Sequence, residues 1–231
     1  MEVLYEDNHI IIVNKKPGEI VQGDKTGDKP LSEIVKEWIK EKYAKPGNVF
    51  LGVAHRLDRP VGGLVVFAKT SKALTRLNDM FRNGEVHKTY WAISRNNPDK
   101  EADTLTHYIT TVERNNKSYA STTPTKDGKE SILKYKVIAH SDRYNLFEVQ
   151  LIPGRKHQIR VQLSSIGCPV KGDLKYGDKR SNPDGSISLM ARNIQFIHPV
   201  SGKEINVTAP VPDDNLWHAL EEATTQNTQE E

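Results

Sequence analysis

The sequence contains a single cysteine, Cys168, which excludes an internal disulfide framework and any zinc or iron–sulfur site built from cysteines. The eight histidines are dispersed, with no pair at helical metal-ligand spacing. The G-x-x-x-x-G-K-[ST], G-x-G-x-x-G, H-E-x-x-H and G-x-S-x-G motifs are all missing. These absences give no support to chemistry with a bound nucleotide, nicotinamide or zinc ion, and we expect neither a cofactor nor a metal site.

Long hydrophobic runs are also lacking, since no stretch approaches the roughly 20 apolar residues of a membrane span. The first seven residues, MEVLYED, are acidic where a secretion signal would be basic and then apolar. We therefore expect a cytoplasmic protein with no membrane partner. With 231 residues, of which 36% are hydrophobic, the chain can bury an adequate core.

Positive charge is unevenly distributed along the chain. Lys and Arg total 33 against 30 Asp and Glu, and residues 55–95 hold eight bases against three acids. Residues 151–180 hold seven bases against two acids, whereas the last eleven residues hold four acids and no base. Two separated basic stretches favour a polyanionic partner such as nucleic acid, with solvated surface lysines as the alternative.

Short apolar runs bounded by turn residues predict most of the secondary structure from residue 86 onward to be strand. Strands are expected at residues 10–13, 64–68, 90–93, 132–138, 146–152, 189–197 and 205–207. Strand runs with a few inserted helices predict an α+β fold, with a mainly antiparallel mixed sheet flanked by helices and loops. We expect residues 1–212 to form a single domain and residues 213–231 a helical turn followed by a frayed, polar acidic tail.

Three stretches carry helical periodicity. Residues 31–39 repeat apolar side chains at the spacing of an amphipathic helix. Ser71 is expected to cap a second helix that ends at Gly84. Residues 155–166 carry a third pattern. One face of this third helix is expected to hold His157, Arg160 and Ser164.

One polar loop comes directly before the apolar run at residues 64–68. Residues 55–58 of this loop read H-R-L-D, which is superficially like the H-R-D loop of protein kinases. The kinase interpretation fails because the aspartate stands one place late and no D-F-G or glycine loop is present. The order of loop and run places Asp58 on a loop against a buried strand.

Residues 55–64, HRLDRPVGGL, resemble the active-site signature of the RluA-type RNA pseudouridine synthases. Three further segments resemble that family in the same order. They are residues 4–18, with the opening LYED and the closing NKKPG; residues 88–90, KTY; and residues 154–161, GRKHQIRV, followed by residues 172–177. The resemblance spans about residues 3–210. Four motifs in sequence are far more specific than H-R-L-D alone.

The sequence departs from the family pattern at three positions: the family usually has Ser at Gly62, Thr at Lys156 and His at Met190. None of the three is a residue to which the resemblance assigns bond making. Many relatives carry a small N-terminal S4-like RNA-binding domain. We expect a stand-alone catalytic domain without it, because the resemblance begins at residue 3.

The resemblance implies a pseudouridine synthase-like catalytic domain that isomerises uridine without a cofactor. Positive charge develops at ribose C1′ as uracil leaves, as in glycoside cleavage, and one carboxylate can stabilise it, attack C1′ or remove the C2′ proton. By resemblance Asp58 is that carboxylate, with the three routes left open. Arg160 occupies the position that pairs with it and keeps it ionised. Tyr90 offers an aromatic face to the uracil and a hydroxyl near C5.

The remaining site residues are assigned to RNA binding. Arg56 is expected to contact phosphate or fill the space left by the flipped base, and Leu189 to form the other side of the base sandwich. His55 is expected either to contact RNA or to hydrogen-bond its own loop. The basic residues expected along the RNA path are Arg59, Lys88, Arg155, Lys156 and Lys171.

We therefore expect an RNA pseudouridine synthase acting on ribosomal large-subunit RNA or tRNA, as a monomer without an obligatory protein partner. One alternative is a catalytically inactive RNA-binding protein of the same fold, which the presence of Asp58, Tyr90 and Arg160 disfavours. A second alternative is a glycoside or nucleoside hydrolase. That activity needs two working carboxylates, and only Asp58 has a motif context.

Overall fold

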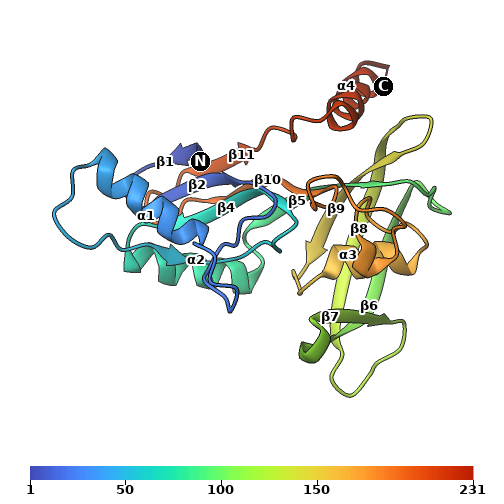
Figure 1. Cartoon of the computed structure of the whole chain (residues 1–231), viewed down its shortest axis with the longest axis horizontal. Coiled ribbons are helices and arrows are strands. Elements are labelled where there is room, and N and C mark those ends of the chain that lie inside the picture. Colours follow the sequence, from blue (N-terminus) through green and yellow to red (C-terminus); the bar gives the residue numbers. More distant parts are fainter. Residues whose placement is uncertain (231) are drawn as a thin grey trace. The chain divides into compact units, whose positions relative to one another are not determined.

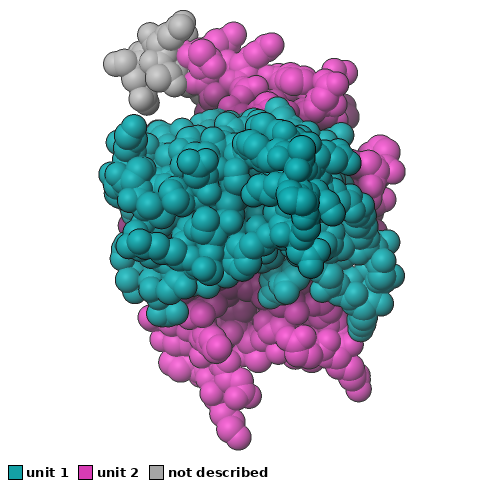
Figure 2. All heavy atoms as spheres, turned by 90° about the vertical axis from the view of Figure 1, so that its left-hand side faces the viewer, with its two compact units in different colours: residues 1–87, 193–209 teal, residues 88–192, 210–231 magenta. Residues whose placement is uncertain are grey.

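The computed structural model describes residues 1–230, and the side chains of residues 1–226. It divides into two compact units, coloured separately in Figure 2. Unit 1 comprises Met1–His87 and Asn193–Ala209, and unit 2 comprises Lys88–Arg192 and Pro210–Glu231. Within the described residues, no helix has the length and apolar character needed to cross a membrane.

Unit 1 is built from antiparallel strands and two helices (Figure 1). Its sheet contains β1 (Glu2–Glu6), β2 (Ile10–Lys15) and β4 (Gly62–Ala68) in this order, with the two-residue β3 (Gly52–Val53) beside β4. A further pair joins β11 (Glu204–Thr208) to the second half of β10 (Leu189–Ile197). The strands predicted at residues 10–13, 64–68 and 205–207 are thus confirmed, and β1 is an addition.

Helix α1 (Leu31–Lys42) buries its apolar stripe on one face of this sheet. The predicted spacing holds, since Leu31, Val35 and Ile39 are buried. They form one core cluster with Val13 and Phe67. Side chains alternate between the two faces of a strand, so the odd-numbered residues of β2 point toward α1.

Helix α2 (Ser71–Asn83) packs against β3 and β4. Its capping residue is Thr70, one position before the predicted Ser71. Thr70 has extended backbone angles, and its hydroxyl accepts a hydrogen bond from the Ala73 N–H at 3.2 Å. Ser71 is already helical and leaves the cap to Thr70. The predicted end is confirmed, because Gly84 adopts the left-handed conformation with φ 74°.

Unit 2 is built on a second antiparallel array (Figure 1). Its strand order is β5 (His87–Ser94), β9 (Asn145–Ile152), β8 (Lys129–His140), β6 (Ala102–Val112) and β7 (Lys117–Ser121). The sequence patterns predicted β5, β8 and β9 but not β6 or β7. In β6 the inward positions are Leu105, His107 and Ile109, and the histidine interrupts the apolar alternation that marks a strand.

Two helices complete unit 2, together with the short 3-10 helices η1 (Glu113–Asn115) and η2 (Leu174–Tyr176). Helix α3 (Gln158–Ser165) starts later than the pattern predicted, because His157 has φ 56° and lies outside the helix. Helix α4 (Asn215–Glu230) is much longer than the single predicted turn. Buried Trp217 and Leu220 anchor it, and Glu221, Glu222 and Ala223, which favour helix, follow them. Glu231, the end of the predicted tail, lies outside the described residues. Helices on mainly antiparallel strands confirm the α+β class.

Candidate active site

The predicted site residues belong to both units. Unit 1 holds His55, Arg56, Asp58 and Arg59, all on the loop between β3 and β4. Unit 2 holds Lys88, Tyr90, Arg155, Lys156, Arg160 and Leu189. The loop of unit 1 brings its four residues together by sequence alone, whereas those of unit 2 come from β5, α3, the turn before α3 and the start of β10.

His55 attaches the loop to the elements that follow it. Its Nε2 accepts a hydrogen bond from the Val66 N–H of β4 at 3.0 Å, and its ring lies 4.8 Å from the ring of Phe81 on α2. Because Nε2 accepts, a neutral ring carries its proton on Nδ1. Through these contacts the His55 ring joins its loop to β4 and α2.

Asp58 is half-buried and lies in a tight turn. Its carbonyl accepts a hydrogen bond from the Val61 N–H at 3.0 Å, and the next carbonyl, of Arg59, accepts one from the Gly18 N–H at 2.8 Å. Leu57 packs against the core cluster under α1. The backbone is thus held both before Asp58, by Leu57, and after it, by the two main-chain bonds. Arg56 is exposed.

The Arg59 side chain forms an ion pair and a hydrogen bond within unit 1. Its Nη2 donates to the Asp28 carboxylate at 2.5 Å and to the Thr26 hydroxyl at 2.9 Å. Both side chains of the ion pair are about half exposed, at 41% for Arg59 and 58% for Asp28. An exposed pair of this kind contributes little to stability, so a phosphate can compete for the guanidinium.

A buried lysine lies beneath the turn. Lys15, the last residue of β2, is 1% exposed. Its Nζ donates to the carbonyl oxygens of Asp58 at 3.3 Å, Arg59 at 3.1 Å and Val61 at 2.6 Å, and to its neighbour Lys16 at 3.1 Å. Burial lowers the pKa of Lys15 from 10.5 to about 8, because desolvation disfavours the charged form.

Two glycines begin the strand that follows the turn. Gly63 has φ 105°, a left-handed conformation that glycine adopts without strain. A Cβ at Gly62 would lie 3.3 Å from Cδ of Pro17 and 3.4 Å from the carbonyl oxygen of Lys15. This close approach is a physical reason for glycine at position 62.

In unit 2, Arg160 forms a buried, two-pronged ion pair. Its Nε donates to Oδ2 of Asp173 at 2.6 Å and its Nη2 donates to Oδ1 at 2.9 Å. The Arg160 and Asp173 side chains are 7% and 1% exposed. Parallel bonds of this kind fix the plane of a guanidinium as well as its position, so Asp173 orients Arg160.

Tyr176 contacts the polar residues of α3 and of the turn before it. Its hydroxyl accepts from the Ser118 N–H at 2.7 Å and lies 2.7 Å from Nδ1 of His157. Its carbonyl accepts from the Ser164 hydroxyl at 2.5 Å, and the Arg160 guanidinium lies 5.0 Å from its ring centroid. Burial raises the pKa of Tyr176. The three polar residues predicted to share a face thus all contact one residue, Tyr176, although His157 lies before the helix.

Tyr90 lies in β5, opposite Val149 of β9, and is 6% exposed. The Lys88 Nζ is 5.8 Å from its ring centroid. Leu189 begins β10 and is also buried. Arg155 and Lys156 are exposed in the turn before α3.

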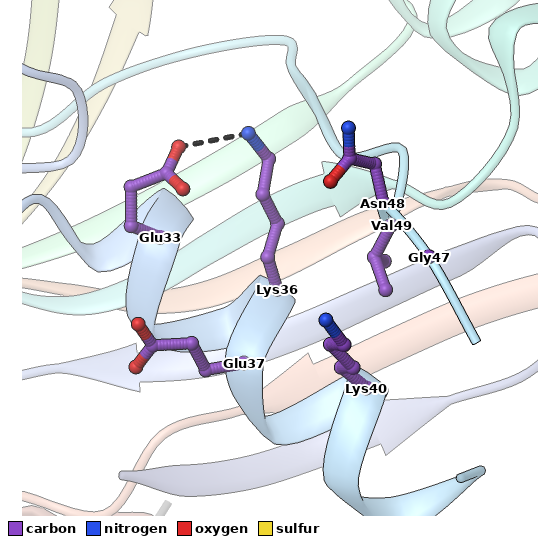
Figure 3. Close-up of a pocket in the computed structure, with 7 residues that line it drawn as sticks. All are labelled: Glu33, Lys36, Glu37, Lys40, Gly47, Asn48 and Val49. Carbon is purple, nitrogen blue, oxygen red and sulfur yellow. Dashed lines mark hydrogen bonds and ion pairs between the residues drawn. The ribbon is translucent and has the colours of Figure 1, made fainter. Parts of the chain in front are cut away.

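A surface pocket of about 420 Å³ lies elsewhere in unit 1, on α1. Figure 3 shows its lining, in which Lys36 contacts Glu33 and the charges alternate in sign. It contains none of the predicted site residues, and its mixed charge does not favour a polyanion. In the described part of the chain, no group of three or more His, Cys, Asp or Glu side chains is arranged to hold a metal ion.

The family described as RNA pseudouridylate synthase matches residues 9–165. The chain belongs to this family. Its members are isomerases that act on RNA. The match includes the Asp58 turn, Lys88, Tyr90 and Arg160, and ends before Asp173, Tyr176 and Leu189.

Among curated relatives, the "Ribosomal large subunit pseudouridine synthase C" of Rickettsia bellii is 34% identical over 91% of this chain and 68% of that protein. The "tRNA pseudouridine synthase C" of Vibrio vulnificus is 29% identical over 95% of this chain and 94% of that protein. The solved structure of "Human RNA Pseudouridylate Synthase Domain Containing 4" has a TM-score of 0.78 at 23% identity, covering 97% of this chain and 93% of that one. This likeness supports the fold.

Three residues that hold side chains or turns of the candidate site in place were not predicted as site residues: Lys15, Asp173 and Tyr176. The signal for Lys15 was present, since it continues the inward alternation of Ile11 and Val13 on β2. Asp173 and Tyr176 stand within the quoted segment 172–177, but their partners on α3 and β7 are distant in sequence and carry no local pattern.

Proposed function

We propose that this synthase converts specific uridines of ribosomal large-subunit RNA or tRNA to pseudouridine. Family membership supports the reaction, and the names of the relatives supply the two RNA classes. The reaction breaks the bond from uracil N1 to ribose C1′ and joins C5 to C1′. The proton leaves C5 and N1 gains one, so no redox partner or donated group is needed.

Asp58 supplies the carboxylate in this proposal. The observation that carries it is the fixed turn, in which main-chain bonds from Gly18 and Val61 hold the carbonyls of Arg59 and Asp58. A carboxylate on such a turn loses little freedom when it meets the sugar, and prior positioning is a large part of catalysis. Its half-burial suits attack on C1′, deprotonation of C2′ and electrostatic stabilisation alike.

Arg160 and Tyr90 complete the proposed catalytic set. Arg160 acts as the cation that keeps Asp58 ionised, and its ion pair with Asp173 keeps its own plane fixed. Tyr90 and Leu189 bracket the flipped uracil, and the Tyr90 hydroxyl takes part in the loss of the C5 proton.

RNA is held by basic residues on the surface of the catalytic domain. Arg56 is exposed directly beside the turn and is proposed to contact phosphate or fill the space of the extruded base. Arg155 and Lys156 are exposed before α3 and contact the backbone, with Arg59, Lys88 and Lys171. His55 is proposed to hold the loop against β4 and α2, because its ring accepts a hydrogen bond from the Val66 N–H and lies 4.8 Å from the ring of Phe81.

We further propose that residues 1–212 act as one catalytic domain, in the cytoplasm, as a monomer without an obligatory protein partner. Sedimentation of the purified protein alone and with RNA tests the stoichiometry, and a stable dimer would contradict it.

The decisive experiment deletes the gene and maps pseudouridine across all stable RNAs. We expect one or a few sites to be lost, restored by the native protein and not by Asp58→Asn. Asp103→Asn, at a half-buried aspartate of unit 2 outside the proposed site, is the matched control and should restore every site. Restoration by Asp58→Asn would refute the role of Asp58. If no site is lost but the purified chain binds RNA, the inactive RNA-binding protein is the correct alternative.

A further inference from the structure

We propose that Tyr119 and the lysines around it bind the RNA strand that flanks the target uridine, and that the Tyr119 ring stacks on an unpaired base of that strand. The inference rests on the proposed function and narrows its substrate to a uridine close to unpaired nucleotides. It is carried by a basic surface of unit 2 formed by β7, the turn before α3 and η2. This β7 surface is defined by Lys117, Tyr119, Lys156 and Lys175.

The β7 surface has an excess of positive charge. The three segments that meet there hold five bases and one acid; they are residues 113–119, 155–156 and 174–176. The Lys175 Nζ donates to the Asn116 carbonyl at 2.9 Å, and the Lys156 Nζ lies 3.6 Å from the carboxylate of Glu113. Because the Glu113 side chain is 84% exposed, this ion pair is weak in water. The remaining charge favours a polyanion such as RNA.

Tyr119 gives this surface an exposed aromatic ring. Tyr119 is 44% exposed, and its hydroxyl accepts a hydrogen bond from Nδ2 of Asn115 at 3.0 Å. Lys117 lies on the same face of β7, two positions earlier, and its Nζ is 5.8 Å from the ring centroid. The ring offers a flat surface to a base, and the ammonium beside it can bind the adjoining phosphate. Stacking on aromatic rings along a basic path is how proteins bind single strands of any sequence.

The outer edge of β7 is closed to a further strand. β7 is the last strand of its array, a position at which a peptide strand can be added. The Ser118 N–H, however, donates to the hydroxyl of Tyr176 at 2.7 Å, and the Ser118 hydroxyl donates to the carbonyl of Lys156 at 2.9 Å. An added strand would find these backbone positions already bonded. The β7 surface therefore favours RNA over an extended peptide.

The β7 surface is continuous with the arginine of the proposed catalytic set. The Lys117 Nζ lies 5.4 Å from the ring centroid of Tyr176, and that centroid lies 5.0 Å from the Arg160 guanidinium. The Tyr119 ring is therefore no more than about 16 Å from this guanidinium, which is about five nucleotides at the spacing of about 3.4 Å along a stacked strand. The base on Tyr119 thus belongs to the immediate neighbourhood of the target uridine.

Filter binding tests the β7 surface with two defined probes, oligouridine of about 12 nucleotides, long enough to cover this span, and an RNA duplex of the same length. Tyr119→Ala should bind oligouridine about tenfold more weakly than wild type, because the stacking ring is lost. Its affinity for the duplex should change less than about twofold, since paired bases do not stack on the ring. An oligouridine affinity equal to that of wild type, or an equal loss for both probes, overturns the proposal.

Two variants serve as matched controls for Tyr119→Ala. Tyr119→Phe keeps the ring and should bind oligouridine within about twofold of wild type. Tyr43→Ala removes a tyrosine of similar exposure, 47%, from unit 1 and should leave the affinity unchanged. A loss in Tyr43→Ala as large as that in Tyr119→Ala would refute a specific role of the β7 surface.

Lys117→Gln keeps the proposal testable if Tyr119→Ala does not fold. Removing one phosphate contact should make the slope of log affinity against log salt shallower by about 0.7 for oligouridine. Lys100→Gln, at a lysine of unit 2 whose side chain is 66% exposed, should leave the slope unchanged. Equal slopes for wild type and Lys117→Gln would refute the phosphate contact.

Kinetics on the RNA identified by the gene deletion separate this proposal from the proposed function. Tyr119→Ala should raise KM about tenfold and change kcat less than about twofold, because the ring touches no reacting atom. If the chain makes no pseudouridine but the oligouridine results hold, the assigned function fails and the β7 surface stands. If pseudouridine is made and Tyr119→Ala binds and reacts like wild type, the β7 surface is wrong and the function stands.

Discussion

Replacing Asp173 by asparagine tests the buried ion pair that orients Arg160. The change keeps the size and shape of the side chain, so it creates no cavity, and it removes one charge. The guanidinium is left buried with its charge uncompensated on that side, because the Arg160 and Asp173 side chains are only 7% and 1% exposed. We expect the free energy of unfolding of unit 2 to fall.

The size of the loss follows from burial and geometry. Removing one partner of a buried pair costs about 3–5 kcal/mol, and the two parallel bonds of 2.6 and 2.9 Å put this pair among the well-formed ones. A domain is stable by about 5–15 kcal/mol, so the variant should fold at 25 °C with a much lower urea midpoint. Its rate should also fall, since Arg160 is no longer held in one plane.

Urea unfolding followed by tryptophan fluorescence measures the loss, with buried Trp91 and Trp217 as probes in unit 2. Asp103→Asn is the matched control: the same chemical change in the same unit, at an aspartate whose lysine partner is 66% exposed. It should change the midpoint far less. A loss below about 1 kcal/mol for Asp173→Asn, or an equal loss for both variants, would refute the assignment of a buried, orienting pair.

Four further outcomes are expected. Thr70→Ala should lower the free energy of unfolding in urea by about 1 kcal/mol through loss of the α2 cap, whereas Ser71→Ala should change it by less than about 0.5 kcal/mol. A larger loss for Ser71→Ala than for Thr70→Ala would identify Ser71 as the cap. Burial raises the pKa of the Cys168 thiol to about 11, so it should react with a thiol reagent at pH 8 only in denaturant, and rapid native reaction would contradict its burial. The pKa of Lys15 is depressed in the folded protein, so between about pH 8 and 10.5 the unfolded chain holds a proton that the folded chain has released. The free energy of unfolding should therefore rise with pH in this window by up to about 3 kcal/mol relative to Lys15→Met. Parallel curves of unfolding free energy against pH for the two proteins would contradict the depressed pKa. RNA affinity measured by filter binding should fall about tenfold or more from about 50 to about 200 mM salt, and an affinity independent of salt would contradict phosphate contacts.

The sequence by itself determined the family, the fold class and the catalytic candidate. Those conclusions depend on contiguous residues: H-R-L-D before a buried strand, the apolar stripe of α1 and the alternating runs of β5, β8 and β9. Local periodicity is set by backbone geometry, and it can be read without knowing what an element packs against.

Tertiary structure alone decided how the site is held. Asp173 binds Arg160 across 13 residues, and Lys15 reaches Val61 across 46, and neither separation follows from a local pattern. β6 was missed because a histidine takes an inward position beside Gln162, whose Nε2 lies 3.0 Å from its Nδ1. A buried polar group is stable only when distant partners satisfy it, and those partners are brought near it only when the chain folds.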